Sequence, residues 1–164
     1  WSMIVVFFSI TMVIIVTKSF IVDVGQVDGV SMEPTFEDQN RFFINKIGYL
    51  VSAPARQDVV QIIDHKERKL LIKRVIGLPG ETIVIKQGKV FVQSSVGMNE
   101  QVLNERYLPA SAYTTTPLQK GPKVYALGPD EYFVLGDHRD QSTDSRVYGA
   151  VHRSKILGAV IGRL

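Results

Sequence analysis

The stretch that decides the fold reads DVVQIIDHKERKLLIKRVIGLPG and covers residues 58–80. Two runs rich in β-branched and apolar residues, 58–63 and 70–76, flank the charged segment 64–69. Two such runs around a short polar segment are typical of a β-hairpin. The Leu78-Pro79-Gly80 tripeptide that follows predicts a tight turn. We therefore expect an antiparallel sheet in the middle of the chain.

The rest of the chain after residue 22 shows the same β-rich pattern. Gln87-Gly88 predicts the turn of a second hairpin. Further strands are predicted at 82–86, 89–92, 131–135 and 156–161. Residues 93–125 are polar, contain three prolines and lack a clear period, which predicts an insertion that leaves the core. The expected fold class is mainly β, without a convincing helical period beyond the N-terminal segment.

The N-terminal segment is strongly apolar. Residues 1–17 carry no charge and include 13 apolar side chains, and the apolar run continues past Lys18 as far as Asp23. A helix of 22 residues is about 33 Å long, close to the roughly 30 Å of bilayer hydrocarbon. A secretory signal peptide would be followed by a small-residue cleavage site, and none follows this segment. A buried helix would show a polar face, which this segment lacks. The sequence therefore predicts one transmembrane anchor over 1–22 and a globular domain over 23–164.

Composition narrows the function classes. The chain has 164 residues and a formal net charge of +3, which suits one domain and does not indicate a nucleic-acid binder. Cysteine is absent from the sequence, which excludes disulfide scaffolds, thiol nucleophiles and cysteine-ligated zinc. His65, His138 and His152 are far apart in sequence, and His65 lies in the charged turn. We expect neither a metal nor an organic cofactor. Because the chain begins with Trp1 rather than Met, we also expect residues upstream of it.

A candidate nucleophile follows the apolar segment, in the turn DGVSMEPT (28–35). Gly29 lets a ligand approach the backbone closely, and Pro34 stiffens the turn around Ser31. The stretch lacks the second glycine of a nucleophile elbow, and the chain has no H-E-x-x-H or Walker A motif. From spacing alone, an ordinary turn serine is the simpler interpretation of Ser31.

A second candidate is Lys73, which lies between apolar neighbours on a predicted strand. The strand period of two puts Leu71, Lys73 and Val75 on one face. If this face is buried, desolvation lowers the pKa of the lysine, and a neutral lysine is a general base. If Leu70 and Ile72 face inward instead, Lys73 points to water. The pattern alone leaves both interpretations open.

The third candidate region is the polar loop GDHRDQSTDSR, residues 136–146, which follows the strand at 131–135. Asp144 and Arg146 could pair to hold the loop, and Asp137 could accept backbone N–H groups. The hydroxyl of Ser142 could orient a lysine amine, a supporting role that needs no charge on the serine.

Taken together, these segments resemble type I signal peptidase, the bacterial membrane-bound serine protease with a Ser–Lys dyad. The matching blocks are SMEPT (31–35), QDVVQI (57–62), KRVIGLPGE (73–81) and GDHRDQSTDSR (136–146). They stand in the order of the family, behind an N-terminal apolar segment, and cover about a fifth of the chain. The resemblance implies the antiparallel β-sheet catalytic domain that signal peptidases share with LexA, behind one transmembrane helix.

The resemblance also implies roles for individual residues. Ser31 would attack the scissile carbonyl, and Lys73 would be the general base that takes its proton. Ser142 matches the family serine that orients the lysine amine. Asp144 and Arg146 match a structural ion pair near the site.

The oxyanion hole is the point at which the resemblance is incomplete. The backbone N–H of Ser31 would contribute to this hole. In some members a serine two residues before the nucleophile supplies the second donor, but that residue is Gly29 in this chain. A second backbone N–H would have to serve, or the oxyanion hole would be weaker.

The substrate that the resemblance implies is an exported preprotein whose signal peptide ends in small residues at −1 and −3. Such a peptide would lie extended along a strand edge, with alternate side chains in shallow pockets. The candidate wall residues are Val27, Met32, Phe36, Leu71 and Ile72. The family further implies a catalytic domain on the extracytoplasmic face of the plasma membrane, or on the lumenal side of a photosynthetic membrane, with the lipid bilayer as a partner and no nucleic acid.

Two residues depart from the family pattern. His138 and Gln141 stand where the family usually has Asn, and both keep hydrogen-bonding capacity. His138 is compatible with a Ser–His–Asp triad in place of the dyad. The sequence is also compatible with a Ser–Lys autoprotease of the LexA type, and with a catalytically inactive, membrane-tethered binding module of the same fold.

Overall fold

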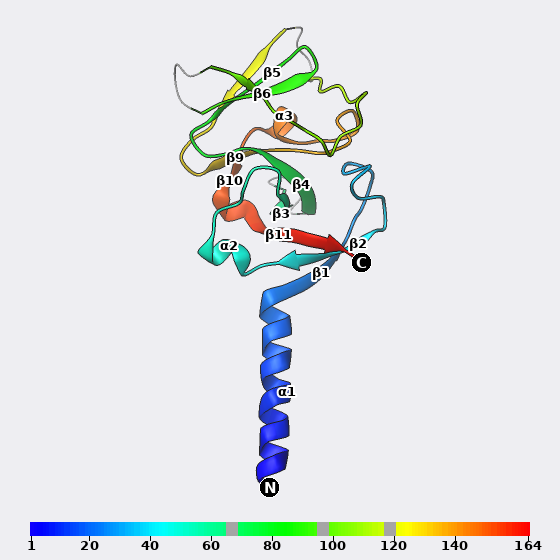
Figure 1. The fold of residues 1–164 in the computed structure, drawn as a ribbon, viewed down its shortest axis with the longest axis vertical. Coiled ribbons are helices and arrows are strands. Elements are labelled where there is room, and N and C mark those ends of the chain that lie inside the picture. Colours follow the sequence, from blue (N-terminus) through cyan, green and yellow to red (C-terminus); the bar gives the residue numbers. More distant parts are fainter. Residues whose placement is uncertain (65–68, 95–98, 117–120) are drawn as a thin grey trace.

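The fold is taken from a computed structural model, which describes residues 1–64, 69–94, 99–116 and 121–164, with the backbone alone for 14–22. The charged turn at 65–68, and with it His65, lies outside the described residues. Two antiparallel sheets make up the domain, and a helix precedes them (Figure 1).

The larger sheet has seven strands in the order β1-β2-β11-β3-β4-β9-β10. Their bounds are β1 Val22–Gln26, β2 Arg41–Asn45, β3 Val59–Ile63, β4 Leu70–Gly77, β9 Glu131–Leu135, β10 Val151–His152 and β11 Ile156–Arg163. The expected hairpin is β3–β4, in which Val60 pairs with Lys73 and Gln61 with Ile72. The prediction of a mainly β fold with antiparallel pairing is therefore confirmed.

The smaller sheet has four strands in the order β7-β6-β5-β8. Their bounds are β5 Thr82–Lys86, β6 Lys89–Gln93, β7 Gln101–Val102 and β8 Lys123–Ala126. The β5–β6 hairpin turns at Gln87 and Gly88, which both have positive φ, as the sequence indicated. Part of the polar stretch 93–125 returns to this sheet, because β7 pairs with β6 and β8 pairs with β5.

Among the described residues, three short helical segments connect the strands: α2 Gly48–Val51, α3 Ser145–Tyr148 and the 3-10 turn Arg153–Lys155. Asp144 caps the N-terminus of α3 by accepting the backbone N–H of Arg146. These segments are too short to show a helical period in the sequence.

One apolar cluster forms the floor beneath the turn that carries Ser31. Its buried members are Val27, Met32, Phe36, Phe42, Ile44, Val59 and Ile72, from β1–β2, β3 and β4. Met32 is fully buried, and the rings of Phe36 and Phe42 meet edge to face, with centroids 6.0 Å apart. Since a fully buried side chain of this size contributes about 1.5–3 kcal/mol, this cluster holds the Ser31 turn against the sheet.

The N-terminal helix α1 (Ser2–Ile21) extends away from the β-domain (Figure 1). Almost all of its described side chains are exposed, and most of these are large and apolar. No helix in the described part of the chain is long and apolar enough to qualify as a membrane span. The predicted transmembrane anchor over 1–22 is therefore not confirmed.

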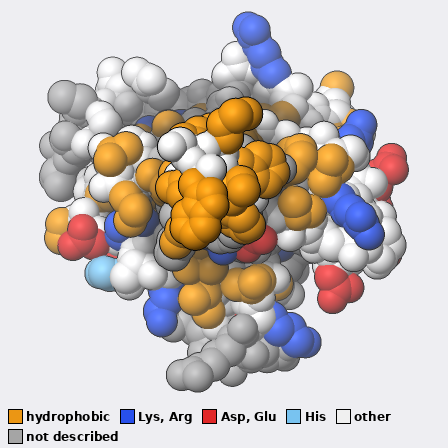
Figure 2. Space-filling view, turned by 90° about the horizontal axis from the view of Figure 1, so that it is seen from below, with side chains coloured by type: hydrophobic (Ala, Val, Ile, Leu, Met, Phe, Trp, Pro, Cys, Tyr) orange, Lys and Arg blue, Asp and Glu red, His pale blue; other side chains and the backbone are white. Residues whose placement is uncertain are grey.

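Exposed apolar side chains also occur on the domain at the end from which α1 leaves. Seen from that end, hydrophobic side chains gather over α1, and more of them lie on the surface around it (Figure 2). Val24 on β1 is 52% exposed, and Leu50 and Val51 on α2 are 81% and 86% exposed. This end of the domain therefore presents an unusually apolar surface to solvent.

Candidate active site

Ser31 and Lys73 meet although they are 42 residues apart. Ser31 lies in a tight turn between β1 and β2, in which Glu33 N–H donates to the Val30 carbonyl and Phe36 N–H to the Met32 carbonyl. Lys73 lies in the middle of β4. The Lys73 Nζ atom is 2.6 Å from Ser31 Oγ, a short hydrogen-bond distance.

The lysine is desolvated. Only 3% of Lys73 is exposed. Of the two interpretations of its strand, the one in which Lys73 lies on a buried face is therefore correct. Desolvation is the largest cause that lowers the pKa of Lys73, and the nearby Arg146 guanidinium acts in the same direction. The Asp144 and Asp137 carboxylates act in the opposite direction and raise this pKa. The net result is a pKa of about 8, so roughly a tenth of Lys73 is neutral at pH 7.

The loop 136–146 approaches the Ser31 turn from the other side. The backbone N–H of His138 donates to the Ser31 carbonyl over 3.1 Å. A Cβ on Gly136 would lie 2.5 Å from that same carbonyl oxygen and 2.2 Å from Ser142 Oγ. Glycine at 136 therefore permits a backbone approach that any side chain would block.

The Ser142 hydroxyl is buried beside this contact, yet it has no hydrogen-bond partner among the described residues. The expected bond from Ser142 to Lys73 is thus not formed in this structure. The role of Ser142 in orienting the lysine amine stays a prediction.

Asp137 connects three segments of the site. Both Asp137 oxygens accept hydrogen bonds from the Arg74 guanidinium, at 2.8 and 2.6 Å, and one also accepts the Thr35 hydroxyl at 2.5 Å. Arg74 directly follows Lys73 on β4, and its guanidinium lies 3.9 Å from the centre of the Tyr107 ring. This buried pair joins the Ser31 turn, the Lys73 strand and the 136–146 loop.

Asp144 and Arg146 form a second buried pair within the loop. Arg146 donates twice to the Asp144 carboxylate, at 2.8 Å each, and Asp144 also accepts the backbone N–H of Gly136. Arg146 further donates to the Thr115 carbonyl. The pair thus fixes the backbone at Gly136, where the loop meets the nucleophile turn.

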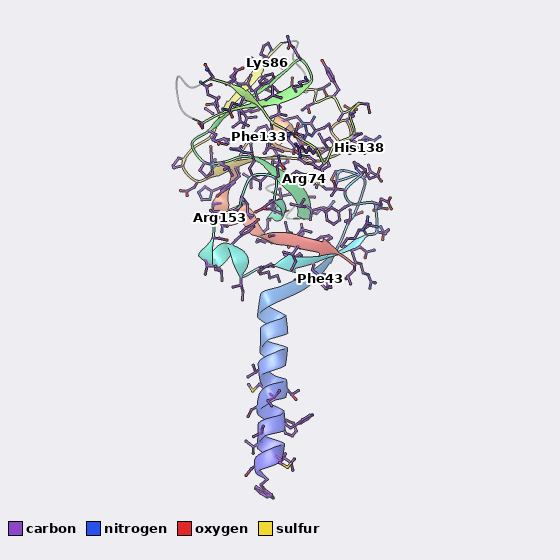
Figure 3. All side chains as sticks on the ribbon, viewed as in Figure 1. Phe43, Arg74, Lys86, Phe133, His138 and Arg153 are labelled. Atoms are coloured by element: carbon purple, nitrogen blue, oxygen red, sulfur yellow. The ribbon has the colours of Figure 1, made fainter. Side chains whose placement is uncertain are left out.

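Arg139 holds the polar stretch 93–125 against the same loop. It donates to the Gly136 carbonyl, to the Glu105 carboxylate and to the Thr114 hydroxyl. Figure 3 labels His138, which comes from the loop, and Arg74, which comes from β4. Sequence reasoning did not identify Arg74 or Arg139 as site residues, and it gave Asp137 only the role of accepting backbone N–H groups. An arginine on a buried strand signals a nearby counter-ion.

The N–H groups near Ser31 differ in what they already bind. Gly29 has a φ of +90°, and its N–H donates to the Asp38 carboxylate over 2.8 Å. The hydrogen bonds among the described residues include none from the Ser31 N–H. The Ser31 N–H is therefore available to a substrate oxygen, whereas the Gly29 N–H is occupied.

A groove of about 390 Å³ opens beside Ser31 and Lys73. It is lined by residues 23–28, Ser31, Phe42, Ile44, Gln61 and residues 69–73. Of the expected wall residues, Val27, Leu71 and Ile72 line this groove. Met32 and Phe36 do not: both are buried in the cluster beneath it.

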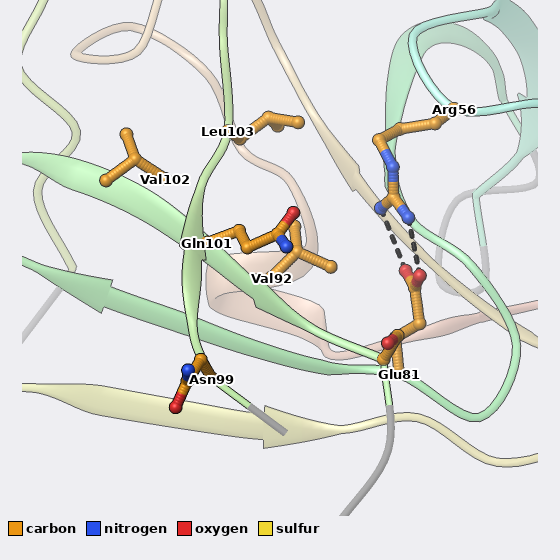
Figure 4. Close-up of a pocket in the computed structure, with 8 residues that line it drawn as sticks. Arg56, Glu81, Val92, Asn99, Gln101, Val102 and Leu103 are labelled. Atoms are coloured by element: carbon orange, nitrogen blue, oxygen red, sulfur yellow. Dashed lines mark hydrogen bonds and ion pairs between the residues drawn. The ribbon is translucent and has the colours of Figure 1, made fainter.

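A larger cavity of about 540 Å³ shares no residue with this groove (Figure 4). Its charged pair is Arg56 and Glu81, which are joined by two hydrogen bonds of 2.5 and 2.8 Å. Arg56 also donates to the Ile76 carbonyl, and Glu81 accepts the Leu78 N–H. Both charges are used within the protein, so neither of them is a free reactive group.

His138 does not contact the Ser31 hydroxyl in any hydrogen bond of the described residues. Its Nδ1 lies 3.3 Å from the Val30 carbonyl and 3.8 Å from the Glu33 carboxylate. These contacts place His138 against the Ser31 turn, and its position does not favour a Ser–His–Asp triad.

Comparison with known proteins identifies the family of the chain. The family model described as signal peptidase, peptidase S26, matches residues 1–164. The chain is 34% identical over 157 residues to a probable signal peptidase I-2 of Synechocystis sp., aligning 89% of this chain with 64% of that protein. It is 33% identical over 160 residues to signal peptidase I V of Bacillus subtilis, aligning 93% of this chain with 90% of that one.

A solved structure shows the same fold. The crystal structure of a signal peptidase I from Enterococcus faecalis aligns with a TM-score of 0.54 and 25% identity, over 68% of this chain and 99% of the other. Since the family model spans the whole sequence and curated relatives align over most of it, the chain belongs to the signal peptidase family, peptidase S26.

Proposed function

We propose that this protein is a serine endopeptidase that removes signal peptides from exported preproteins, with Ser31 as nucleophile and Lys73 as general base. The observation that carries this proposal is the 2.6 Å contact between Ser31 Oγ and a buried Lys73 Nζ whose pKa is lowered to about 8. A serine hydroxyl becomes a nucleophile when an adjacent base accepts its proton.

The proposed reaction has two stages. Neutral Lys73 takes the proton of Ser31 as Oγ attacks the scissile carbonyl. The oxyanion that forms accepts a hydrogen bond from the backbone N–H of Ser31. The Lys73 ammonium then gives its proton to the leaving amine, which breaks the peptide bond and leaves the signal peptide as an ester on Ser31. Water activated by Lys73 hydrolyses this ester and restores the free hydroxyl.

The groove offers room for an extended peptide between two free strand edges. Within the described residues β1 pairs only with β2, so its other edge is open along residues 23–26. On β4, pairing with β9 begins at Arg74, so the preceding residues 70–73 are open on that side. Both open edges line the groove beside Ser31. A substrate strand there would form backbone hydrogen bonds and present alternate side chains to the wall.

The apolar wall favours the small residues of the A-x-A pattern. Ile72, Phe42 and Ile44 line the groove and are themselves at most 8% exposed. Shallow apolar pockets over such a packed floor favour alanine and other small side chains over large ones. This selection is part of the proposal.

The direct test is the cleavage of a precursor with an A-x-A site, followed by mass spectrometry of the new N-terminus. We expect the wild-type protein to cut after the second alanine and Ser31→Ala to cut nothing detectable. Cleavage by both proteins would contradict the role of Ser31. Binding of signal peptides without cleavage by the wild type would favour the inactive binding module instead.

The location of the reaction is a further part of the proposal. We place the β-domain on the extracytoplasmic face of the membrane, with α1 and the apolar end around Leu50 and Val51 next to the lipid. The exposed apolar side chains on that end support its contact with lipid (Figure 2). The choice of the extracytoplasmic side follows from the resemblance to the family.

This orientation is tested with intact spheroplasts that express the protein. Protease added outside is expected to digest the β-domain completely, as detected with an antibody to its C-terminal strand. A cytoplasmic marker protein should survive in the same sample. A β-domain that survives like the marker, and is lost only after lysis, would overturn the proposed orientation.

A further inference from the structure

Gln61 is a polar side chain on the floor of the groove. It lies in the middle of β3, is 6% exposed, and lines the groove together with Ser31 and Lys73. A glutamine this deeply buried is uncommon, because burial removes the water that would solvate its amide.

Within the sheet, the neighbours of Gln61 are apolar. Ile72 stands opposite it on β4, and Gly158, which has no side chain, stands opposite it on β11. Ile44 fills the space over that glycine, since a Cβ on Gly158 would lie 2.7 Å from Ile44 Cγ2. Ile72 and Ile44 also line the groove, so Gln61 lies between two apolar wall residues.

The Gln61 amide has no partner in the part of the protein that the structure describes. No side-chain hydrogen bond there is made to or from this amide. Its nitrogen and oxygen are not among the unpaired side-chain atoms that are fully shielded from solvent. Its two N–H donors and its carbonyl oxygen therefore face the groove. Removal of the remaining water by a purely apolar substrate side chain would leave these polar atoms unsatisfied, which is costly.

We infer that Gln61 makes one position of the groove selective for a substrate side chain that forms hydrogen bonds, such as Ser, Thr or Asn, upstream of the scissile bond. This inference rests on the proposed function and refines its substrate class. A hydroxyl can both donate to the Gln61 carbonyl and accept from its N–H groups. A substrate residue of the same size without the hydroxyl leaves the amide unpaired, and sites built to pair a hydroxyl discriminate strongly against such analogues.

The test compares threonine with valine, which have nearly the same shape, at each of positions −1, −2 and −3 of one precursor. At one of these positions, wild-type protein is expected to give a kcat/KM about tenfold higher for Thr than for Val. Gln61→Leu is expected to abolish or invert this preference, because this position of the groove then offers no hydrogen-bonding group. Its kcat/KM for the Val precursor should rise relative to its kcat/KM for the Thr precursor, and a midpoint of thermal unfolding close to that of the wild type shows that the variant is folded.

Control variants separate the groove from general effects of losing a glutamine. Gln101 is exposed on β7, outside the groove, so Gln101→Leu should keep the wild-type Thr preference. Gln61→Met also removes the amide, and the new side chain is more flexible than leucine. This variant should lose the Thr preference as Gln61→Leu does.

The outcomes are distinct. A wild-type protein that cleaves no precursor would contradict the proposed function itself. Cleavage with equal rates for Thr and Val at all three positions, or a Thr preference that persists in both Gln61 variants, would overturn the inference and leave the proposed function standing.

Discussion

Replacing Lys73 by methionine is expected to lower kcat/KM for a precursor by about 10⁴-fold or more. The side chain keeps its length and fills the same space, but Ser31 loses the base that accepts its proton. Removal of one member of a nucleophile–base unit elsewhere costs between about 10⁴ and 10⁶ in kcat. The measurement is the rate of appearance of mature product at saturating and subsaturating precursor.

Stability separates lost catalysis from lost folding. Lys73 is 3% exposed and its burial disfavours the charged form, so methionine is expected to keep or raise the midpoint of thermal unfolding. His138→Asn serves as the comparison, since His138 contacts the turn but not Ser31 Oγ in the described bonds, and its activity should stay within tenfold of the wild type. A fully active Lys73→Met protein, or an inactive His138→Asn protein, would direct attention back to a histidine base.

The same lysine sets the expected pH dependence of the wild-type enzyme. Only neutral Lys73 can take the serine proton, and its pKa is lowered to about 8. The kcat/KM should therefore rise about tenfold per pH unit below this value and level off above it. A plateau that extends down to pH 6 would show that no group with this pKa controls the reaction.

The sequence predicted those parts of the fold that depend on local pattern. The β3–β4 and β5–β6 hairpins have strong β-branched runs around turn residues, and both were placed within about one residue. β1 and β2 were not predicted as strands: β1 is VDVGQ, with an interior charge and a glycine, and it pairs with the distant β2 rather than within a tight hairpin. Their strand structure depends on packing against the rest of the sheet, which a local pattern does not reveal.

The candidate site shows the same division. Ser31 and Lys73 were candidates in the sequence, but their catalytic roles came from the resemblance to the family. The face of β4 that carries Lys73 could not be decided, since apolar residues occur on both faces. Met32 and Phe36 were expected in the groove wall and lie in the cluster beneath it, because the tight turn directs them into the core. The Arg74–Asp137 pair joins residues 63 positions apart, and no spacing rule indicates such a partner.

Replacing Asp137 by asparagine is expected to lower the free energy of unfolding by about 3–5 kcal/mol. The change leaves the buried Arg74 guanidinium without its counter-charge, and breaking one side of a buried pair costs this much because the remaining charge stays desolvated. Thr35 loses its carboxylate acceptor at the same time. Urea unfolding followed by fluorescence of the intact protein measures the difference. Asp140→Asn, an exposed change three residues away, should shift the free energy by less than about 0.5 kcal/mol.

A second readout shows whether Asp137 also acts on the reaction through its charge. The Asp137 carboxylate raises the pKa of Lys73, so in Asp137→Asn this pKa should fall below its value of about 8. At a temperature where the variant is still folded, the rise of kcat/KM with pH should therefore occur at lower pH than in the wild type. Purely structural bracing would lower the activity equally at every pH and leave the midpoint unmoved. A midpoint displaced to higher pH would contradict the proposed field of Asp137 at the lysine, because loss of a negative charge cannot make an ammonium harder to deprotonate.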